Sequence, residues 1–345
     1  MTTQININEA GKLIASIGRT NTVVLQGEPG IGKSALLPSV AKDTGLEPRY
    51  IDCALLDLGD IQMPKVTDKV EFVPNSLFVS PPDKPVVVML DEIGKAMRPV
   101  QNALLTLLLE HRVGTYKLPE GSVVFGTTNM ATDGVGDMLQ AHAKNRVTFV
   151  TVAKPDANTW IEWALNNDID PAVAAWVHEY PHCLASYTDG ESANDNPYIF
   201  NPRSQQAAFV SPRSLAHASH VVKQRENLPD DVLIAALAGT VGESAARDMQ
   251  AFLSIKDSLT PWDKIVADPE NAPLPENAVA SIIQCLGATQ RIDNTSAKAW
   301  MTYMNRLTKE VQFMFISLAK QSKCFVVLAQ NREFRDWCLN NNYAF

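Results

Sequence analysis

The sequence is poor in the features that mark secreted, membrane-spanning or zinc-binding proteins. Its 345 residues include five cysteines, an odd number that is widely scattered and has no C-x-x-C pair. This pattern predicts neither a disulfide framework nor a zinc finger. No apolar run is long enough to cross a bilayer, and the N-terminus lacks a basic segment followed by an apolar one. These absences predict a soluble protein of the reducing cytoplasm, without a membrane partner.

An excess of positive charge is also missing. The formal net charge is −8, which argues against a protein that binds nucleic acid over its whole surface by counter-ion release. The net charge does not exclude a pore that is lined locally by basic residues. The hydrophobic content of 46% in this length is sufficient for two or three domains with real cores.

The clearest motif lies near the N-terminus. Residues 27–34 read Gly-Glu-Pro-Gly-Ile-Gly-Lys-Ser and match the P-loop (Walker A) spacing G-x-x-x-x-G-K-[ST], between a β-rich run at 22–26 and a helical pattern. Glycines let the backbone wrap around an anion, and the helix start directs N–H groups toward it. A Gly-Pro turn before an ordinary helix would explain Pro29, but not the Lys-Ser pair. We expect Lys33 at the β- and γ-phosphates of ATP and Ser34 on Mg²⁺. The predicted nucleotide-binding residues are Gly27, Glu28, Pro29, Gly30, Ile31, Gly32, Lys33, Ser34 and Ala35.

Two carboxylates follow the next strongly apolar run. Residues 86–90 predict a strand buried on both faces of a parallel sheet, and Asp91 and Glu92 stand at its C-terminal end. This is the Walker B pattern, in which Asp91 would join the Mg²⁺ site and Glu92 would orient or deprotonate the attacking water. The same dipeptide could merely cap the next helix. Its pairing with a P-loop favours a hydrolase over a kinase or a passive binder.

A further strand is predicted over residues 122–128, with Asn129 at its end. If this strand neighbours the Walker B strand, the Asn129 amide lies near the γ-phosphate and could hold the attacking water by donating and accepting hydrogen bonds. Alternatively, Asn129 simply begins a turn.

The remaining pattern predicts the following elements. A helix is expected over residues 8–18 with Asn8 as its N-cap. Hairpins are expected within 64–82 and over 112–119, and a last strand over 147–150. Beyond Lys154 the pattern becomes helical, with helices at residues 160–164, 173–177, 212–220, 276–287 and, as one longer helix, 300–318. Residues 189–202 read as a long surface loop.

In this order of elements the chain resembles an AAA+ ATPase. Details are similar to the MoxR and dynein-related branch, which carries a helix 2 insertion: the segment 56–64 with the hairpin after it, the Gly-x-Tyr-x-Leu-Pro segment at 114–119, and Asn145-Arg146. The resemblance implies an α/β fold with a P-loop parallel sheet flanked by helices, then a small helical lid and a helical C-terminal extension. The implied boundaries are 1–153, 154–250 and 251–345.

Two arginines receive roles only from this resemblance. Arg146 matches the arginine finger that reaches the γ-phosphate of a neighbouring subunit, although the sequence has Asn-Arg-Val where Asn-Arg-Phe is more usual. Lys144 and Arg112 are alternative cations. By itself, Arg146 is explained as a cation near a helix C-terminus. Arg213, in a Ser-Pro-Arg motif, matches the lid arginine called sensor 2. The serine and proline of this motif are explained without any role in ATP binding, because Ser211 as N-cap and a proline after it favour the start of a helix. This explanation does not account for the arginine.

The resemblance implies a hexameric ring that couples ATP hydrolysis to remodelling or activation of a partner protein with a von Willebrand factor A domain, a chaperone-like role. Two alternatives stay open. One is a DNA-associated motor or loader, with Lys65, Lys69, Arg112 and Lys117 of the two hairpins lining a pore. The other is a nucleotide-gated scaffold that hydrolyses slowly or not at all, against which the complete set of site residues argues.

Overall fold

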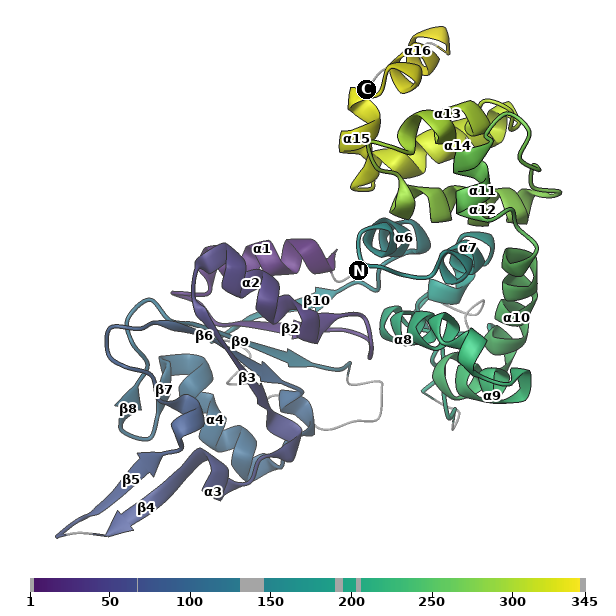
Figure 1. Cartoon of the computed structure of the whole chain (residues 1–345). Helices are drawn as coiled ribbons and strands as arrows, with labels where there is room; N and C mark the ends of the chain where they lie inside the picture. Colours follow the sequence, from purple (N-terminus) through teal and green to yellow (C-terminus); the bar gives the residue numbers. More distant parts are fainter. Residues whose placement is uncertain (1–2, 67, 131–145, 190–194, 203–205, 342–345) are drawn as a thin grey trace. The chain divides into compact units, whose positions relative to one another are not determined.

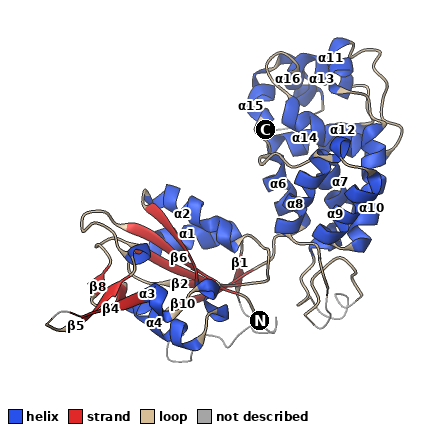
Figure 2. Ribbon diagram, turned by 60° about the horizontal axis from the view of Figure 1, so that its bottom comes forward, coloured by secondary structure: helices blue, strands red, loops and turns tan. Residues whose placement is uncertain are grey.

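The computed structural model describes residues 3–66, 68–130, 146–189, 195–202 and 206–341 (Figure 1). The chain divides into two compact units, Met1–Lys154 and Pro155–Phe345. The described strands belong to the first unit, whereas the second is built from helices (Figure 2). From Pro155 on, the residues predicted to form the lid and the C-terminal extension lie together in this second unit.

The first unit is built on a six-stranded sheet in which each neighbouring pair is parallel. The strand order across the sheet is β1 (Gln4–Ile5), β10 (Thr148–Val152), β2 (Val23–Gln26), β9 (Val123–Thr128), β6 (Val86–Asp91) and β3 (Glu47–Asp52). Strands β6 and β9 are neighbours, as the placement of Asn129 requires. The predicted α/β fold with a P-loop parallel sheet is therefore confirmed.

Helices cover both faces of this sheet because successive side chains of its strands point to opposite sides. Helices α1 (Ile7–Ile17) and α2 (Leu36–Thr44) pack against Val23 and Leu25, whereas α3 (Leu58–Ile61) and α4 (Arg98–Glu110) share a core with Val24. Figure 1 shows these two helical layers on either side of the strands. The burial of both faces explains why the central strands read as continuous apolar runs.

Helix α1 begins earlier than its sequence pattern predicts. Its N-cap is Asn6, whose Oδ1 accepts a hydrogen bond from the Glu9 N–H at 2.9 Å. The Glu9 carboxylate in turn accepts from the Asn6 N–H at 2.8 Å, which completes a capping box. The prediction of Asn8 as the N-cap is therefore wrong, because only Asn6 stands three residues before a glutamate that can return the bond.

Two antiparallel hairpins extend from the first unit, and both predictions are confirmed. Strands β4 (Gln62–Val66) and β5 (Val70–Pro74) form the first, and β7 (Arg112–Val113) and β8 (Tyr116–Lys117) form the second. The second hairpin is tied to the segment that follows the first, because the Tyr116 hydroxyl accepts from the Ser80 N–H at 2.8 Å and donates to the Ser80 carbonyl at 2.7 Å. Short 3₁₀ segments lie at Lys33–Ala35 (η1), Cys53–Leu55 (η2), Ser76–Phe78 (η3) and Ile93–Lys95 (η4).

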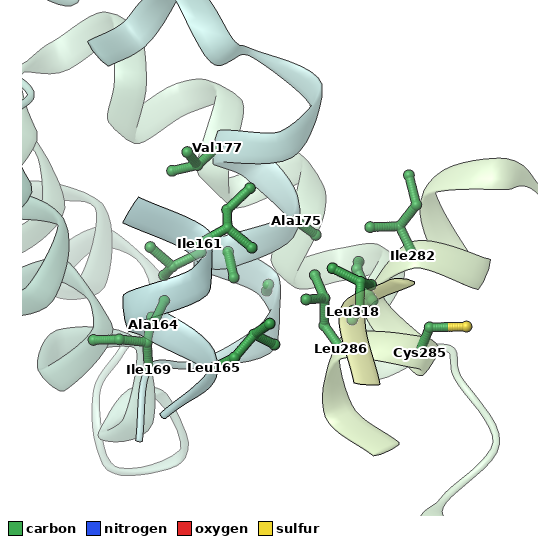
Figure 3. Close-up of a cluster of buried hydrophobic side chains, with 14 of the residues drawn as sticks. Ile161, Ala164, Leu165, Ile169, Ala175, Val177, Ile282, Cys285, Leu286 and Leu318 are labelled. Carbon is green, nitrogen blue, oxygen red and sulfur yellow. The ribbon is translucent and has the colours of Figure 1, made fainter. Parts of the chain in front are cut away.

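The second unit has one apolar core that draws on residues far apart in the sequence. Figure 3 shows Ile161 and Leu165 close to Leu286 and Leu318 within it. The described helices are α6 (Ala157–Leu165), α7 (Pro171–Glu179), α8 (Pro212–Lys223), α9 (Asp230–Val241), α10 (Glu243–Asp257), α11 (Trp262–Ala267), α12 (Ala278–Arg291), α13 (Ala297–Met304), α14 (Lys309–Lys320), α15 (Cys324–Gln330) and α16 (Arg332–Asn340). The 3₁₀ segments are Pro181–Leu184 (η6) and Arg225–Asn227 (η8). The predicted start of α8 is confirmed, since the Ser211 hydroxyl accepts from the Ser214 N–H at 3.1 Å.

The single long helix predicted over residues 300–318 is wrong, because the chain breaks between α13 and α14. Gln312 is buried there, and its amide donates to the carbonyls of Asn305 at 3.1 Å and Leu307 at 2.8 Å. These bonds satisfy backbone groups that a continuous helix would have paired. Leu307, in the connector between the two helices, is also buried. The apolar pattern therefore continues across the break, and the sequence alone does not reveal where the helix ends.

The five cysteines are free thiols and are buried. Within the described residues, no single helix is long and apolar enough to cross a membrane; the pair α14 and α15 passes that test only when taken together, although it is bent by 113°.

Candidate nucleotide-binding site

The P-loop connects β2 to η1 and has a backbone that its glycines make possible. Gly30 and Gly32 have φ values of 75° and 104°, the left-handed region that favours glycine. A Cβ added to Gly27 would lie 2.7 Å from the Ile31 Cδ1 atom and 2.9 Å from the Val152 carbonyl oxygen. Gly27 is therefore packed closely between the Ile31 side chain and β10, which leaves no room for a side chain at this position.

Lys33 directs its ammonium group into this loop. Its Nζ donates to the carbonyls of Gly27 at 2.7 Å and Glu28 at 2.8 Å, and to the Asn129 Oδ1 at 3.1 Å. Although Lys33 is charged, it is only 7% exposed. The structure therefore brings two of the predicted site residues into contact, Lys33 of η1 and Asn129, which follows β9.

Asp91, at the end of β6, is surrounded by hydroxyl groups. The Ser34 hydroxyl donates to its Oδ2 at 2.8 Å, the Tyr50 hydroxyl donates to the same oxygen at 2.9 Å, and Thr127 donates to Oδ1. Asp91 is buried, so these bonds offset the cost of removing its charge from water. Ser34 and Asp91 offer hard oxygen donors beside the P-loop, a set that fits Mg²⁺.

Two of these hydroxyl donors were missed by sequence reasoning. Thr127 is one of the polar residues at the end of β9, of which only Asn129 was predicted to belong to the site. Tyr50 lies on β3, whose pairing with β6 could not be read from local sequence. Burial, together with the hydrogen bond to the Asp91 carboxylate, raises the pKa of the Tyr50 hydroxyl.

Glu92 follows in a sharp turn. Its φ of 54° is left-handed, and its N–H donates to the Thr127 hydroxyl at 3.2 Å. The carboxylate forms an ion pair with Lys95, at the end of η4. The Glu92 side chain is 32% exposed, so water can reach the group predicted to act on it.

The two predicted arginines belong to different units. Arg146 is exposed in the turn before β10, and Arg213 is exposed near the start of α8 in the second unit. Lys144 lies outside the described residues. Arg112 pairs with the Glu110 carboxylate at 2.8 Å and donates to the Gly114 carbonyl at 2.6 Å.

A buried ion pair lies next to the P-loop and was also missed. The carboxylate of Glu28 is 3.9 Å from the ammonium of Lys154, and their side chains are 7% and 3% exposed. Lys154 is the last residue of the first unit. The pair therefore links the P-loop to the point where the chain leaves this unit.

Comparison with known proteins gives one family match. Residues 23–150 match the model of the ATPase family associated with various cellular activities (AAA). No curated protein sequence matches the chain.

Three of the solved structures to which the chain is similar share little sequence identity with it. A point mutant of RuvB from Thermotoga maritima is 14% identical, with 82% of this chain and 83% of that chain covered and a TM-score of 0.39. A putative ATPase from Cytophaga hutchinsonii is 16% identical, with coverages of 90% and 79% and a TM-score of 0.34. NtrX from Brucella abortus, in complex with ADP, is 14% identical, with coverages of 99% and 69% and a TM-score of 0.38.

The family match runs from the first residue of β2 into β10. It includes the whole stretch that carries the P-loop, Asp91, Glu92 and Asn129. Most of the first unit of this chain is therefore similar to the AAA family domain.

Proposed function

We propose that this protein is a MoxR-like AAA+ ATPase, which hydrolyses ATP to ADP and phosphate in a ring and uses the reaction to remodel or activate a partner protein. The observation that carries the proposal is the convergence of four side chains from three places in the fold, namely η1, the end of β6 and the residue that follows β9. Ser34 bonds to Asp91 at 2.8 Å, and Lys33 bonds to Asn129 at 3.1 Å. A passive loop would not need this combination of a cation, two oxygen donors and an amide.

In this proposal the P-loop holds the phosphates of ATP. Its backbone N–H groups surround them, and the Lys33 ammonium neutralises charge on the β- and γ-phosphates. The Ser34 hydroxyl and the Asp91 carboxylate would hold Mg²⁺, which when bound neutralises charge on the same phosphates. Tyr50 and Thr127 keep the Asp91 carboxylate oriented through their hydrogen bonds.

The attacking water is placed by Glu92 and Asn129. Its oxygen forms a bond to the γ-phosphorus as the bond to the oxygen that bridges the β- and γ-phosphates breaks, and the Glu92 carboxylate accepts its proton. The Asn129 amide is close to the Lys33 ammonium, so both groups can act on the same phosphate. Asn129 can orient the water because an amide both donates and accepts.

The ring rests on the resemblance together with the exposure of two arginines. Arg146 is exposed next to β10, where a neighbouring subunit in a hexamer could receive its guanidinium at the γ-phosphate. Arg213 would contact the γ-phosphate from the lid. ATP would then bridge two units and two subunits, and its hydrolysis would change the angle between them.

The β4–β5 hairpin supports a protein partner. Cross-strand pairing places Pro64 beside Phe72 and Val66 beside Val70 on one face of the hairpin. Val66 is 77% exposed, Val70 63% and Phe72 48%. An exposed apolar face of this kind marks a protein contact. The partner of the proposal is a protein with a von Willebrand factor A domain, an assignment that rests on the resemblance alone.

The DNA alternative is less well supported. Lys65 stands directly opposite Glu71 in the hairpin, and Arg112 is paired with Glu110. These carboxylates reduce the positive charge that would attract phosphates. A scaffold that does not hydrolyse ATP is disfavoured because Glu92 and Asn129 serve hydrolysis and are not needed for binding.

The test compares Glu92→Gln with Lys33→Ala in assays of ATP binding and of phosphate release. We expect Glu92→Gln to bind ATP but to lose about 10²–10⁴-fold in kcat, the range for a general base. Lys33→Ala should lose binding itself. Glu120→Gln, which removes an exposed carboxylate of the same unit, serves as control. Equal hydrolysis by Glu92→Gln and Glu120→Gln would contradict the proposed function.

A further inference from the structure

The turn after β6 holds the backbone of Glu92 in a fixed position. Ile93 is fully buried, and its side chain packs directly on Gly126 of β9. A Cβ added to Gly94 would lie 2.5 Å from the Thr128 hydroxyl oxygen, so β9 also contacts the next residue closely. Since Glu92 itself bonds to Thr127, three consecutive residues of the turn are held against β9.

Helix α4 closes the same turn from its other end. The amide of Gln101 donates to the Ala96 carbonyl at 2.9 Å and reaches the Gly94 carbonyl at 3.4 Å. With the backbone held on both sides, the Glu92 carboxylate can move only by rotation of its own side chain. Whatever the carboxylate binds therefore decides where it points.

The group that it binds is the ammonium of Lys95. Lys95 follows Glu92 by three residues in the sequence. The Lys95 side chain is 35% exposed and the Glu92 side chain is 32% exposed. A carboxylate that accepts hydrogen bonds from an ammonium has fewer lone pairs available for a water molecule. The ion pair thus competes with the contact that Glu92 must make in hydrolysis.

We propose that Lys95 is a positioning residue that holds Glu92 in a resting conformation, and that this ion pair must open before Glu92 can act on the attacking water. The inference rests on the proposed function, in which Glu92 orients or deprotonates that water. Partial exposure of the pair keeps its strength small, which makes opening by a bound nucleotide or a neighbouring subunit feasible. Lys95 therefore lowers the basal rate of hydrolysis without contributing to ATP binding.

The test measures kcat and the affinity for ATP in Lys95→Met and Lys95→Arg. Lys95→Met should raise basal kcat by about 1.5-fold to fivefold, which corresponds to the 0.2–1 kcal/mol typical of a partly exposed ion pair, with ATP affinity unchanged. Lys95→Arg should remain close to wild type because it keeps the charge. Lys12→Met makes the same charge change at an exposed position of α1 and should have no effect. In a Glu92→Gln background, Lys95→Met should also have no effect.

An unchanged or lower kcat in Lys95→Met, with unchanged ATP affinity and an active wild type, would overturn the inference. A rise that persists in the Glu92→Gln background would also overturn it, because Lys95 would then act on another group. Failure of the proposed function gives a different result. In that case the wild type does not bind ATP, or it hydrolyses ATP no faster than Glu92→Gln.

Discussion

At the scale of single residues, Asp91 depends on donors that come from three different elements. Tyr50 lies on β3, Ser34 on η1 and Thr127 on β9. A ligand carboxylate that is oriented by outer hydrogen bonds presents a defined oxygen to a metal. Tyr50 is the most easily tested of these donors, because Tyr50→Phe removes the hydroxyl and keeps the ring.

We expect Tyr50→Phe to weaken Mg²⁺-dependent ATP binding by up to about tenfold, the lower end of the range for outer-shell partners. Titration of Mg²⁺ against a fluorescent ATP analogue measures the change. Urea unfolding of the same variant shows whether the fold is intact. An unchanged Mg²⁺ requirement would mean that Ser34 and Thr127 orient Asp91 without Tyr50.

His111 gives the first unit a dependence on pH. It follows α4, has a left-handed φ of 50°, and its Nε2 lies 3.3 Å from the Thr22 hydroxyl. Burial, and secondarily the charge of Lys117, lower the pKa of His111 from its ordinary 6.5. The folded state therefore favours the neutral ring, so the unfolded state binds more protons as the pH falls through this region.

We predict that the first unit loses stability as the pH falls below about 6.5, the pKa that His111 regains when the chain unfolds. In His111→Asn this part of the pH dependence should disappear, because asparagine tolerates a left-handed backbone and does not titrate. Thermal unfolding at pH 5, 6 and 8 measures it. If the unfolding temperature changed equally with pH in the wild type and the variant, the assignment to His111 would be contradicted.

At the scale of elements, the break between α13 and α14 depends on one buried side chain. Gln312 donates to the carbonyls of Asn305 and Leu307, and its Oε1 accepts from the Trp337 indole N–H at 2.8 Å. It therefore joins α14 both to the connector before it and to α16.

Gln312→Ala should destabilise the second unit by about 2–4 kcal/mol, because several buried polar groups lose a partner and each costs about 1–3 kcal/mol. Urea unfolding followed by tryptophan fluorescence measures the loss. Gln321→Ala, at the exposed end of the same helix, is the matched control and should change stability by less than about 0.5 kcal/mol. Similar losses in both variants would show that the buried hydrogen bonds are not decisive.

The elements that could be predicted are those whose signal is local. Residues 27–34 and 86–92 combine strand, turn and functional residues in one stretch, and both hairpins have their turn residues between β-rich runs. The features that were not predicted depend on residues that are distant in the sequence. Tyr50 and Thr127 contact Asp91 only because β3, β6 and β9 are adjacent in the sheet. The helix can break after Met304 because the Gln312 side chain donates hydrogen bonds to the backbone carbonyls at the break. At α1, the choice between Asn6 and Asn8 required the return bond from Glu9.

At the scale of the whole molecule, the two units have separate apolar cores. The groups proposed to act on ATP are divided between them, with Lys33, Glu92 and Arg146 in the first and Arg213 in the second. Each unit by itself therefore lacks part of the proposed machinery. In the proposed ring, a site is complete only when a neighbouring subunit supplies Arg146.

The most direct measurement is the ATPase rate per subunit as a function of protein concentration, for the wild type and Arg146→Ala, with particle mass recorded in ATP. We predict that activity rises as rings form. Arg146→Ala should assemble but lose about 10³-fold or more in kcat, the contribution of an arginine finger, and should regain activity when mixed with Glu92→Gln. Activity that is independent of concentration and unaffected by Arg146→Ala would contradict the ring mechanism.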